Sequence, residues 1–251
     1  MGKLIQLLSE ELQEKIEEYI ETHELKAHDK LPSERSLCEL FSANRATLRE
    51  ALKHMQNEGI IYTQHGKGTF IAESKYTEDV QRFISYSSGW AADGYEVKSK
   101  VIDFVIIEAP KKIASSLQIK IGTLTYLLRR IRYLNNTPLF LETAYIPVEY
   151  CPKLDSFNFA KCSLYNILKE FYHINLTHQE QTIAITKLSS YEAHLLNVAK
   201  DISAFYIKGL TRTDKGTPFE YCISLIPSTK YKMYGELNTS PQKIKNVKGL
   251  L

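Results

Sequence analysis

The chain has 251 residues, enough for one large domain or two smaller ones with separate cores. Its 43% hydrophobic and 24% charged content is that of an ordinary globular protein. No run of about 18 apolar residues occurs, so we expect no membrane span, and early acidic residues argue against a signal peptide. The four cysteines lie far apart, which favours reduced thiols in a cytoplasmic protein over a disulfide framework.

The net charge of +3 indicates no particular partner, but its distribution along the chain is uneven. Residues 1–72 contain nine Lys or Arg residues and twelve Asp or Glu residues. Most of these acids fall in the first predicted helix, where they are typical of a solvated face. Any positive surface in this part of the chain must therefore be a local face.

Three helices are predicted in the first 60 residues. Apolar residues at helical spacing predict an amphipathic helix from about Ser9 to His23, with a stripe formed by Leu8, Leu12, Ile16, Tyr19 and Ile20. Pro32 interrupts the chain, and Ser33 is a good N-cap for a second helix over 34–41. Asn44 is a suitable N-cap for a third helix over 45–58, with Gly59 at its C-terminal end.

A hairpin follows the third helix. Residues 60–63 and 69–72 are short β-rich runs around the glycine-rich turn of "QHGKGTF". A Walker loop would require a different spacing between a strand and a helix, so this stretch is not predicted to bind a nucleotide. The N-terminal 72 residues are thus predicted to form a helix-turn-helix with a two-stranded wing.

The remainder of the chain has a different pattern. Residues 73–79 are polar and are predicted to form a linker. Six β-rich runs follow, and "NNTP" and "DKGTP" are turn signals between adjacent strands. Helix-like segments occur at 109–119, 163–173 and 189–199. This part is therefore predicted to be α+β, with an antiparallel sheet partly covered by helices.

A helix-turn-helix inserts its second helix into the major groove of DNA, and the first residues of that helix reach the base edges. Arg49 and Lys53 lie four residues apart, away from the apolar stripe of Leu48, Leu52 and Met55. These two cations can therefore face DNA while the stripe faces the core. On periodicity alone, Arg45, Arg49 and Lys53 could equally form an ordinary solvated helix face.

The segment from Leu31 to Ala72 resembles the winged helix-turn-helix of the GntR family of bacterial repressors. It contains L-P-S-E-R, R-x-T-x-R-E-A-L, E-G and H-G-K-G-T-F in that order. The resemblance implies DNA contacts at Arg35, Arg45, Thr47, Arg49, His65, Gly66 and Lys67. We add Asn44, Ala46 and Lys53 to the expected interface. Asn44 and Ala46 replace residues that many members have there, so the operator bases at those positions are expected to differ.

Residues from about Asp79 to Tyr234 resemble the UTRA effector-binding domain of the HutC subfamily, whose fold resembles chorismate lyase. "SYSSGWAADG", "RRIRYLNNTPLFLETAYIP", "SLYNILKEFY" and "RTDKGTPFEYCISLIP" carry this resemblance. We therefore predict a DNA-binding domain over 1–72, a linker over 73–79, and an effector-binding and dimerisation domain over 80–251.

Some members of that subfamily bind phosphorylated sugars or amino sugars. Their phosphate contacts correspond here to Ser87, Arg130, Arg132, Ser163 and Tyr165. Arg130 and Arg132 alternate with Ile131 on a predicted strand, so both can grip one phosphate, and Ser163 precedes a helix N-terminus that favours anions. Glu142 and Glu220 would accept hydrogen bonds from sugar hydroxyls, and Tyr86 would form an apolar wall.

Other interpretations of this site remain open. Arg130, Arg132 and Glu142 could form a cross-strand ion-pair ladder without a ligand. The effector could instead be a different small anion, such as a carboxylate. Ile223, Ile226 and Pro227 stand where the subfamily often has polar or aromatic residues, which suggests a smaller or more apolar end of the ligand.

The sequence thus predicts a homodimeric repressor of a carbohydrate-related operon. It would bind a palindromic DNA operator and be released by a small anionic effector; an effector that tightens DNA binding is the less favoured alternative. No cofactor, metal or membrane partner is expected. The histidines lack metal-ligand spacing and no G-x-S-x-G motif occurs, so a lyase-like enzyme is not favoured. An interaction module whose winged helix contacts protein instead of DNA is a second alternative that is not favoured.

Overall fold

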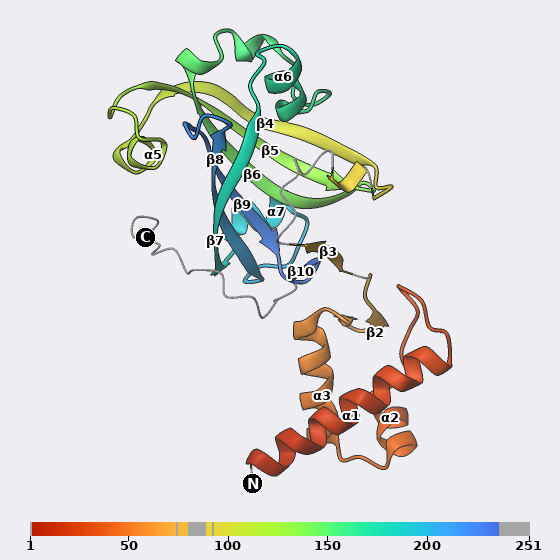
Figure 1. Ribbon diagram of the computed structural model, residues 1–251. Coiled ribbons are helices and arrows are strands. Elements are labelled where there is room, and N and C mark those ends of the chain that lie inside the picture. The colour runs from red at the N-terminus through yellow and green to blue at the C-terminus, as the bar shows by residue number, and fades with distance from the viewer. Residues whose placement is uncertain (1, 74, 80–88, 92, 236–251) are drawn as a thin grey trace, which may run out of the picture. The chain divides into compact units, whose positions relative to one another are not determined.

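The chain forms two compact units in the computed structural model, which describes residues 2–73, 75–79, 89–91 and 93–235 (Figure 1). The first, here called the N-terminal unit, comprises Met1–Thr77 together with Ser228–Lys232. The second, the C-terminal unit, comprises Glu78–Pro227 and the chain from Met233 onward. Part of the N-terminal unit therefore comes from near the other end of the sequence.

The N-terminal unit begins with three helices: α1 (Gly2–Thr22), α2 (Glu34–Phe41) and α3 (Arg45–Glu58). The second and third have the predicted bounds because their ends are capped. The side chains of Ser33 and Asn44 accept hydrogen bonds from backbone N–H groups in the first turns of α2 and α3. Gly59 ends α3 in the left-handed conformation with φ of 70°. Helix α1 starts earlier than predicted.

These helices share one hydrophobic core. Leu12 and Ile16 of α1 pack with Leu48, Ala51 and Met55 of α3, and Leu31, Leu37, Ile61 and Ile71 complete the cluster. Leu8 was expected in the same stripe, but it is 43% exposed. The core of the unit thus begins one helical turn later than the apolar pattern suggested.

The wing consists of β1 (Ile61–Gln64) and β2 (Gly68–Ile71), paired antiparallel. Both strands are shifted by one residue toward the turn relative to the prediction, because Gln64 pairs with Gly68 and leaves 65–67 as the turn. The segment before α2 lies along β2: Leu31 N–H donates to the carbonyl of Thr69, and Ile71 N–H donates to the carbonyl of Asp29.

The predicted linker contains a strand. Residues Tyr76–Asp79 form β3, which pairs with β10 (Tyr231–Tyr234) in a separate two-stranded sheet. Tyr76 N–H donates to the carbonyl of Lys230 at 3.0 Å. Polar composition suggested an irregular segment here, but strand pairing with a distant part of the chain overrides that local signal.

The C-terminal unit is built on a six-stranded antiparallel sheet with the order β4-β5-β6-β9-β8-β7. Its strands are β4 (Val97–Glu108), β5 (Leu124–Leu134), β6 (Thr137–Pro147), β7 (Leu176–Lys187), β8 (Ser203–Thr213) and β9 (Pro218–Pro227). The turns "NNTP" and "DKGTP" join β5 to β6 and β8 to β9 as predicted. The α+β prediction is confirmed.

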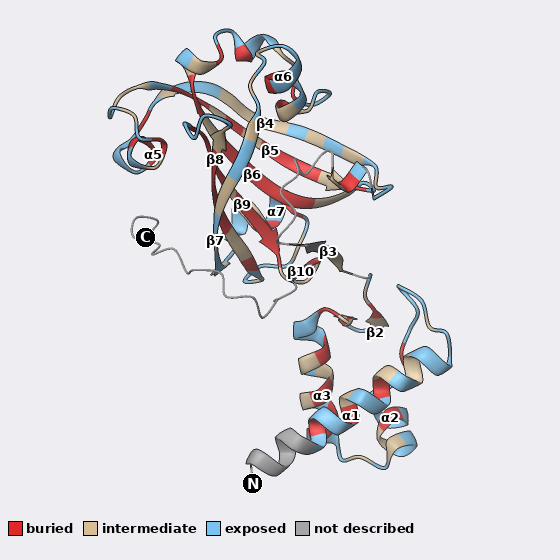
Figure 2. Ribbon diagram, viewed as in Figure 1, coloured by how far each residue is buried: buried red, intermediate tan, exposed pale blue. Residues whose placement is uncertain are grey.

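Helices cover both faces of this sheet. Helix α6 (Leu164–Glu170) packs on the face that carries Tyr126 and Leu128, here called the site face. Helices α5 (Lys111–Leu117) and α7 (Ser190–Leu195) pack on the opposite face. The short helices η1 (Val148–Tyr150) and η2 (Leu154–Ser156) lie between β6 and α6 in the sequence. Figure 2 shows that the central strands are the most deeply buried. Among the described residues, no helix is long and apolar enough to cross a membrane.

Candidate DNA interface and effector site

The start of α3 presents the residues predicted to read DNA. Asn44, Arg45, Ala46, Arg49 and Lys53 are all exposed. Asn44 also caps the helix, because its Oδ1 accepts a hydrogen bond from the backbone N–H of Thr47 at 2.9 Å. The side-chain oxygen of Asn44 therefore already accepts a hydrogen bond, and its amide N–H₂ group remains available to a base.

Several cations of this surface have local carboxylate partners. Arg35 pairs with Glu39 and Arg49 pairs with Glu34, each at 3.0 Å, and Lys53 lies 3.7 Å from Glu50. The three cations are largely exposed and the three carboxylates are at least 41% exposed, so each ion pair is weak and its partner can be exchanged for a phosphate or a base. The acidic residues thus offset part of the positive charge of this surface in the free protein.

Thr47 differs from the other predicted contacts. It is only 4% exposed and packs within the helical core rather than on the surface. The resemblance to the GntR family implied a DNA contact at Thr47. In the helix, however, residue 47 lies next to the core residue Leu48 and is itself buried. Burial leaves little of the Thr47 side chain accessible to a ligand.

The wing turn carries the other expected contacts. His65, Gly66 and Lys67 are exposed at the tip of the hairpin. Gly66 and Gly68 have φ values of 72° and 125°, which side chains other than glycine adopt only with strain. Glycines at these two positions permit the tight turn and leave Lys67 between them.

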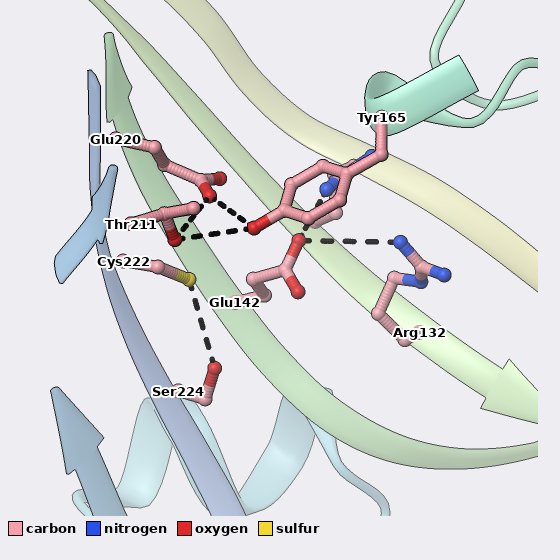
Figure 3. A network of polar contacts seen from close by, with 8 residues as sticks. Arg132, Glu142, Tyr165, Thr211, Glu220, Cys222 and Ser224 are labelled. Atoms are coloured by element: carbon pink, nitrogen blue, oxygen red, sulfur yellow. Dashed lines mark hydrogen bonds and ion pairs between the residues drawn. The ribbon is translucent and has the colours of Figure 1, made fainter. Parts of the chain in front are cut away.

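The predicted effector residues meet on the site face through strand register. Arg130 of β5 is directly opposite Glu142 of β6, and Glu142 is opposite Ser224 of β9. Glu220 of β9 is opposite Thr211 of β8. All five side chains are at most 4% exposed. Four strands therefore contribute polar groups to one buried patch of the sheet (Figure 3).

Two arginines surround Glu142. Arg130 makes a charged hydrogen bond to Glu142 through Nη2, and Nη1 of Arg132 lies 4.0 Å from the same carboxylate oxygen. Burial alone would raise the pKa of Glu142, but the two guanidinium groups outweigh it and hold the pKa below its usual range. Glu142 is therefore ionised. In the described part of the chain, Nε and Nη1 of Arg130 have no hydrogen-bond partner.

Glu220 has the opposite protonation behaviour. Burial raises its pKa to about 7, despite hydrogen bonds from Tyr165 and Thr211 and the charge of Arg130. The Tyr165 hydroxyl, which reaches down from α6, donates to Oε2 of Glu220 at 2.6 Å (Figure 3). Burial, together with the Glu220 charge, raises the pKa of Tyr165 well above its usual value, so this hydroxyl remains a donor.

Sequence reasoning missed three polar members of the patch: Thr211, Cys222 and Ser224. Cys222 and Ser224 follow Glu220 at intervals of two, and their Sγ and Oγ atoms lie 3.8 Å apart. The period of two could have assigned them to the face of Glu220. Thr211 could not be found in this way, because its position opposite Glu220 depends on the register between β8 and β9.

The remaining predicted effector residues have different positions. Ser163 stands at the N-cap of α6, but its side chain makes no capping hydrogen bond. Ile223 packs against the core under α5, on the face opposite Glu220, so it cannot line the effector site as its sequence position suggested. Tyr86 and Ser87 lie outside the described residues.

These side chains can together hold a small polar anion. Buried guanidinium donors suit a phosphate or carboxylate, and Glu142 and Glu220 can accept hydrogen bonds from hydroxyl groups. The Arg130–Glu142 pair is also a cross-strand ion pair of the kind that needs no ligand. The two unpartnered donors of Arg130 are not explained by that pair alone.

Comparisons with known proteins agree with this architecture. Residues 92–232 match the UTRA domain, and residues 8–71 match the bacterial regulatory proteins of the gntR family. The chain is 28% identical to the HTH-type transcriptional repressor NagR of Bacillus subtilis, over 88% of this chain and 90% of NagR.

A second relative is the mannosyl-D-glycerate transport/metabolism system repressor MngR of Escherichia coli. It is 25% identical to this chain, over 90% of the chain and 93% of MngR. The crystal structure of PhnF from Mycobacterium smegmatis has the same fold, with a TM-score of 0.64 and 20% identity over 91% of this chain and all of PhnF. The matched families and these relatives are transcriptional regulators, not enzymes. The chain belongs to the GntR family, HutC subfamily, and is a DNA-binding transcriptional repressor with a UTRA domain.

Proposed function

We propose that this repressor is released from its operator by a phosphorylated sugar or amino sugar that binds at the site face of the C-terminal unit. The observation that carries the proposal is the buried Arg130, whose Nε and Nη1 have no partner in the described part of the chain. Buried donors of a charged group are costly unless a ligand or another group satisfies them.

The balance of charge at the site supports an anionic ligand. Arg130 and Arg132 contribute two positive charges, whereas Glu142 contributes one negative charge. Glu220 has a pKa of about 7, so it is only partly ionised near neutral pH. The buried patch thus has an excess of positive charge, which a phosphate would neutralise.

The sugar part of the ligand would lie toward the two glutamates. Ionised Glu142 and the second oxygen of Glu220 are acceptors suited to hydroxyl groups. The relative MngR is a repressor of a mannosyl-D-glycerate transport/metabolism system, which supports a carbohydrate-related effector for this chain as well.

On the DNA side, we propose that a homodimer in the cytoplasm binds a palindromic operator, with one α3 in each half-site. Two-fold symmetry of the protein requires two-fold symmetry of the DNA, with half-sites about one helical turn or a multiple apart. Effector and operator would weaken each other's binding by the same factor. Equal effector affinity with and without operator would contradict this scheme.

Thermal-shift measurements test the effector proposal. Hexose 6-phosphates and amino-hexose 6-phosphates should raise the melting temperature of the C-terminal unit, because a ligand that binds the native state stabilises it. The unphosphorylated sugars and inorganic phosphate serve as matched comparisons. A shift with simple carboxylates alone would assign the site to a carboxylate, and no shift with any anion would favour the ion-pair ladder.

Arg132→Ala separates effector binding from DNA binding. We expect this variant to bind operator normally and to lose release by the effector, because Arg132 lies beside Glu142 but far in sequence from the winged helix. Arg129→Ala is the matched control, since Arg129 is the adjacent arginine of β5 and pairs with Asp103 at 3.2 Å. Normal release in the Arg132 variant would remove the phosphate assignment.

A further inference from the structure

Lys30 was not among the predicted DNA contacts, yet the fold brings it against the wing. It precedes α2 and forms an isolated antiparallel bridge with Phe70 of β2. Hydrogen bonds of 2.9 Å on either side, from Ile71 to Asp29 and from Leu31 to Thr69, fix its backbone. Leu31 is buried in the core of the unit, which anchors the position further.

The side chain of Lys30 runs across Gly68. A Cβ atom built on Gly68 would lie only 2.7 Å from Cε of Lys30 and 3.4 Å from its Nζ. Gly68 therefore serves the positive φ of the turn and also leaves space for the lysine stem. This packing places the ammonium group of Lys30 beside Gly68, the first residue of β2, which directly follows Lys67.

Lys30 is also available to a ligand. It is exposed, and it makes no ion pair with the described residues, in contrast to Arg35 and Arg49, which each have a carboxylate partner. Neutralising a DNA phosphate would therefore cost Lys30 no existing ion pair. Lysine is a compact point charge, which suits a phosphate better than a base edge.

We propose that Lys30 is a further DNA-binding residue, which contacts a backbone phosphate beside the wing together with Lys67. The contact rests on the proposed DNA interface, in which the wing touches the duplex. It adds sequence-independent affinity and fixes the position of the wing on the DNA, whereas α3 reads the bases.

The test is the salt dependence of DNA binding by the full-length protein. Dissociation constants are measured by fluorescence anisotropy on a random-sequence duplex and on the operator, between about 0.05 and 0.2 M salt. Lys30→Met keeps the apolar stem and removes the charge. Lys30→Met should make the plot of the log association constant against log salt concentration less steep by about 0.9. It should also weaken binding about fivefold at physiological salt, equally on both duplexes. Lys30→Arg should restore both values.

Two further variants make the result decisive. Lys15→Met, on α1 beside Glu11, is the control and should leave the slope unchanged. Lys67→Met should lower the slope as Lys30→Met does. An unchanged slope for Lys30→Met with a lowered slope for Lys67→Met would overturn the role of Lys30 alone. Unchanged slopes for both would overturn the wing contact itself, and weaker binding with an unchanged slope would show that Lys30 acts through packing.

Discussion

Glu142 and Glu220 are two buried glutamates of one site with opposite pKa shifts. Glu142 lies between two arginines and its pKa is lowered, whereas burial dominates at Glu220 and raises its pKa to about 7. One carboxylate is therefore a permanent charge of the site, and the other changes its charge near physiological pH. This difference has a measurable effect on stability.

We expect the C-terminal unit to become less stable as the pH rises, because of Glu220. A carboxyl group with a raised folded-state pKa stabilises the fold at low pH, and this contribution is lost as the pH rises through about 7. Between pH 5 and pH 8, the free energy of unfolding of the wild type should therefore fall by roughly 2–3 kcal/mol relative to that of the Glu220→Gln variant.

Urea unfolding followed by the fluorescence of Trp90 measures this difference, because the single tryptophan is buried in the C-terminal unit. Glu180→Gln, at a partly exposed position of β7, controls for the loss of a carboxylate. The same pH dependence in the Glu220→Gln variant and the wild type would show that Glu220 does not titrate in this range.

Arg49→Ala should lower specific operator binding by roughly 1–3 kcal/mol, the range for a lost bidentate base contact. Its ion pair with Glu34 is exposed and contributes little to folding, so the loss should not reflect unfolding. Anisotropy on operator and random DNA distinguishes the possible roles. An equal loss on both would identify Arg49 as a phosphate contact instead.

At the scale of elements, α3 has a well-defined cap at each end. Asn44 begins the helix and Gly59 ends it in the left-handed conformation. Both were recognisable in the sequence, because N-cap and C-terminal preferences depend only on the residue and its neighbours. The bounds of α3 were accordingly predicted correctly.

Asn44 has one observed role, the helix cap, and one proposed role, a base contact, and two substitutions separate them. Asn44→Ala should destabilise the N-terminal unit by about 1 kcal/mol, because the Thr47 N–H loses its acceptor. Asn44→Ser should restore the cap but remove the amide group that could read a base. Hydrogen exchange of the α3 amides measures the first effect. If Asn44→Ser kept the full operator preference, Asn44 would be a cap only.

The proposed effector site was only partly predictable, and the reason is long-range register. Arg130, Arg132 and Glu142 could be assigned to one site because they lie on two strands joined by a short turn. Thr211 depends on the pairing of β8 with β9, and the nearness of Ser224 to Glu142 depends on the pairing of β9 with β6. Since β9 is separated from β6 by about 70 residues, no local pattern contains that information.

At the scale of the whole molecule, the N-terminal unit is made of two chain segments, and the second of them is Ser228–Lys232. This segment directly follows β9, which carries Glu220, Cys222 and Ser224. It reaches the end of α3: a Cβ atom built on Gly59 would lie 2.9 Å from the carbonyl oxygen of Thr229 and 2.8 Å from Cε of Lys75. Gly59 is therefore required by packing as well as by its backbone conformation.

Gly59→Ala should destabilise the N-terminal unit more than Gly66→Ala. Both residues have φ near 70°, so both substitutions introduce a strain of about 1–2 kcal/mol. Only Gly59 has neighbours within reach of the new methyl group, whereas nothing lies within 4 Å at Gly66. Hydrogen exchange of α3 and β1 compares the two variants. Equal losses would mean that Thr229 and Lys75 move aside without cost.

The return of the chain at Ser228–Lys232 makes the DNA-binding unit discontinuous in sequence. A single cut of the polypeptide cannot therefore yield both units intact. A protease that cleaves near residue 78 would separate the three helices and the wing from Ser228–Lys232, and Gly59 would lose its close approach to Thr229. Residues 228–232 would have to be joined back to the N-terminal segment to restore that contact in an isolated N-terminal unit.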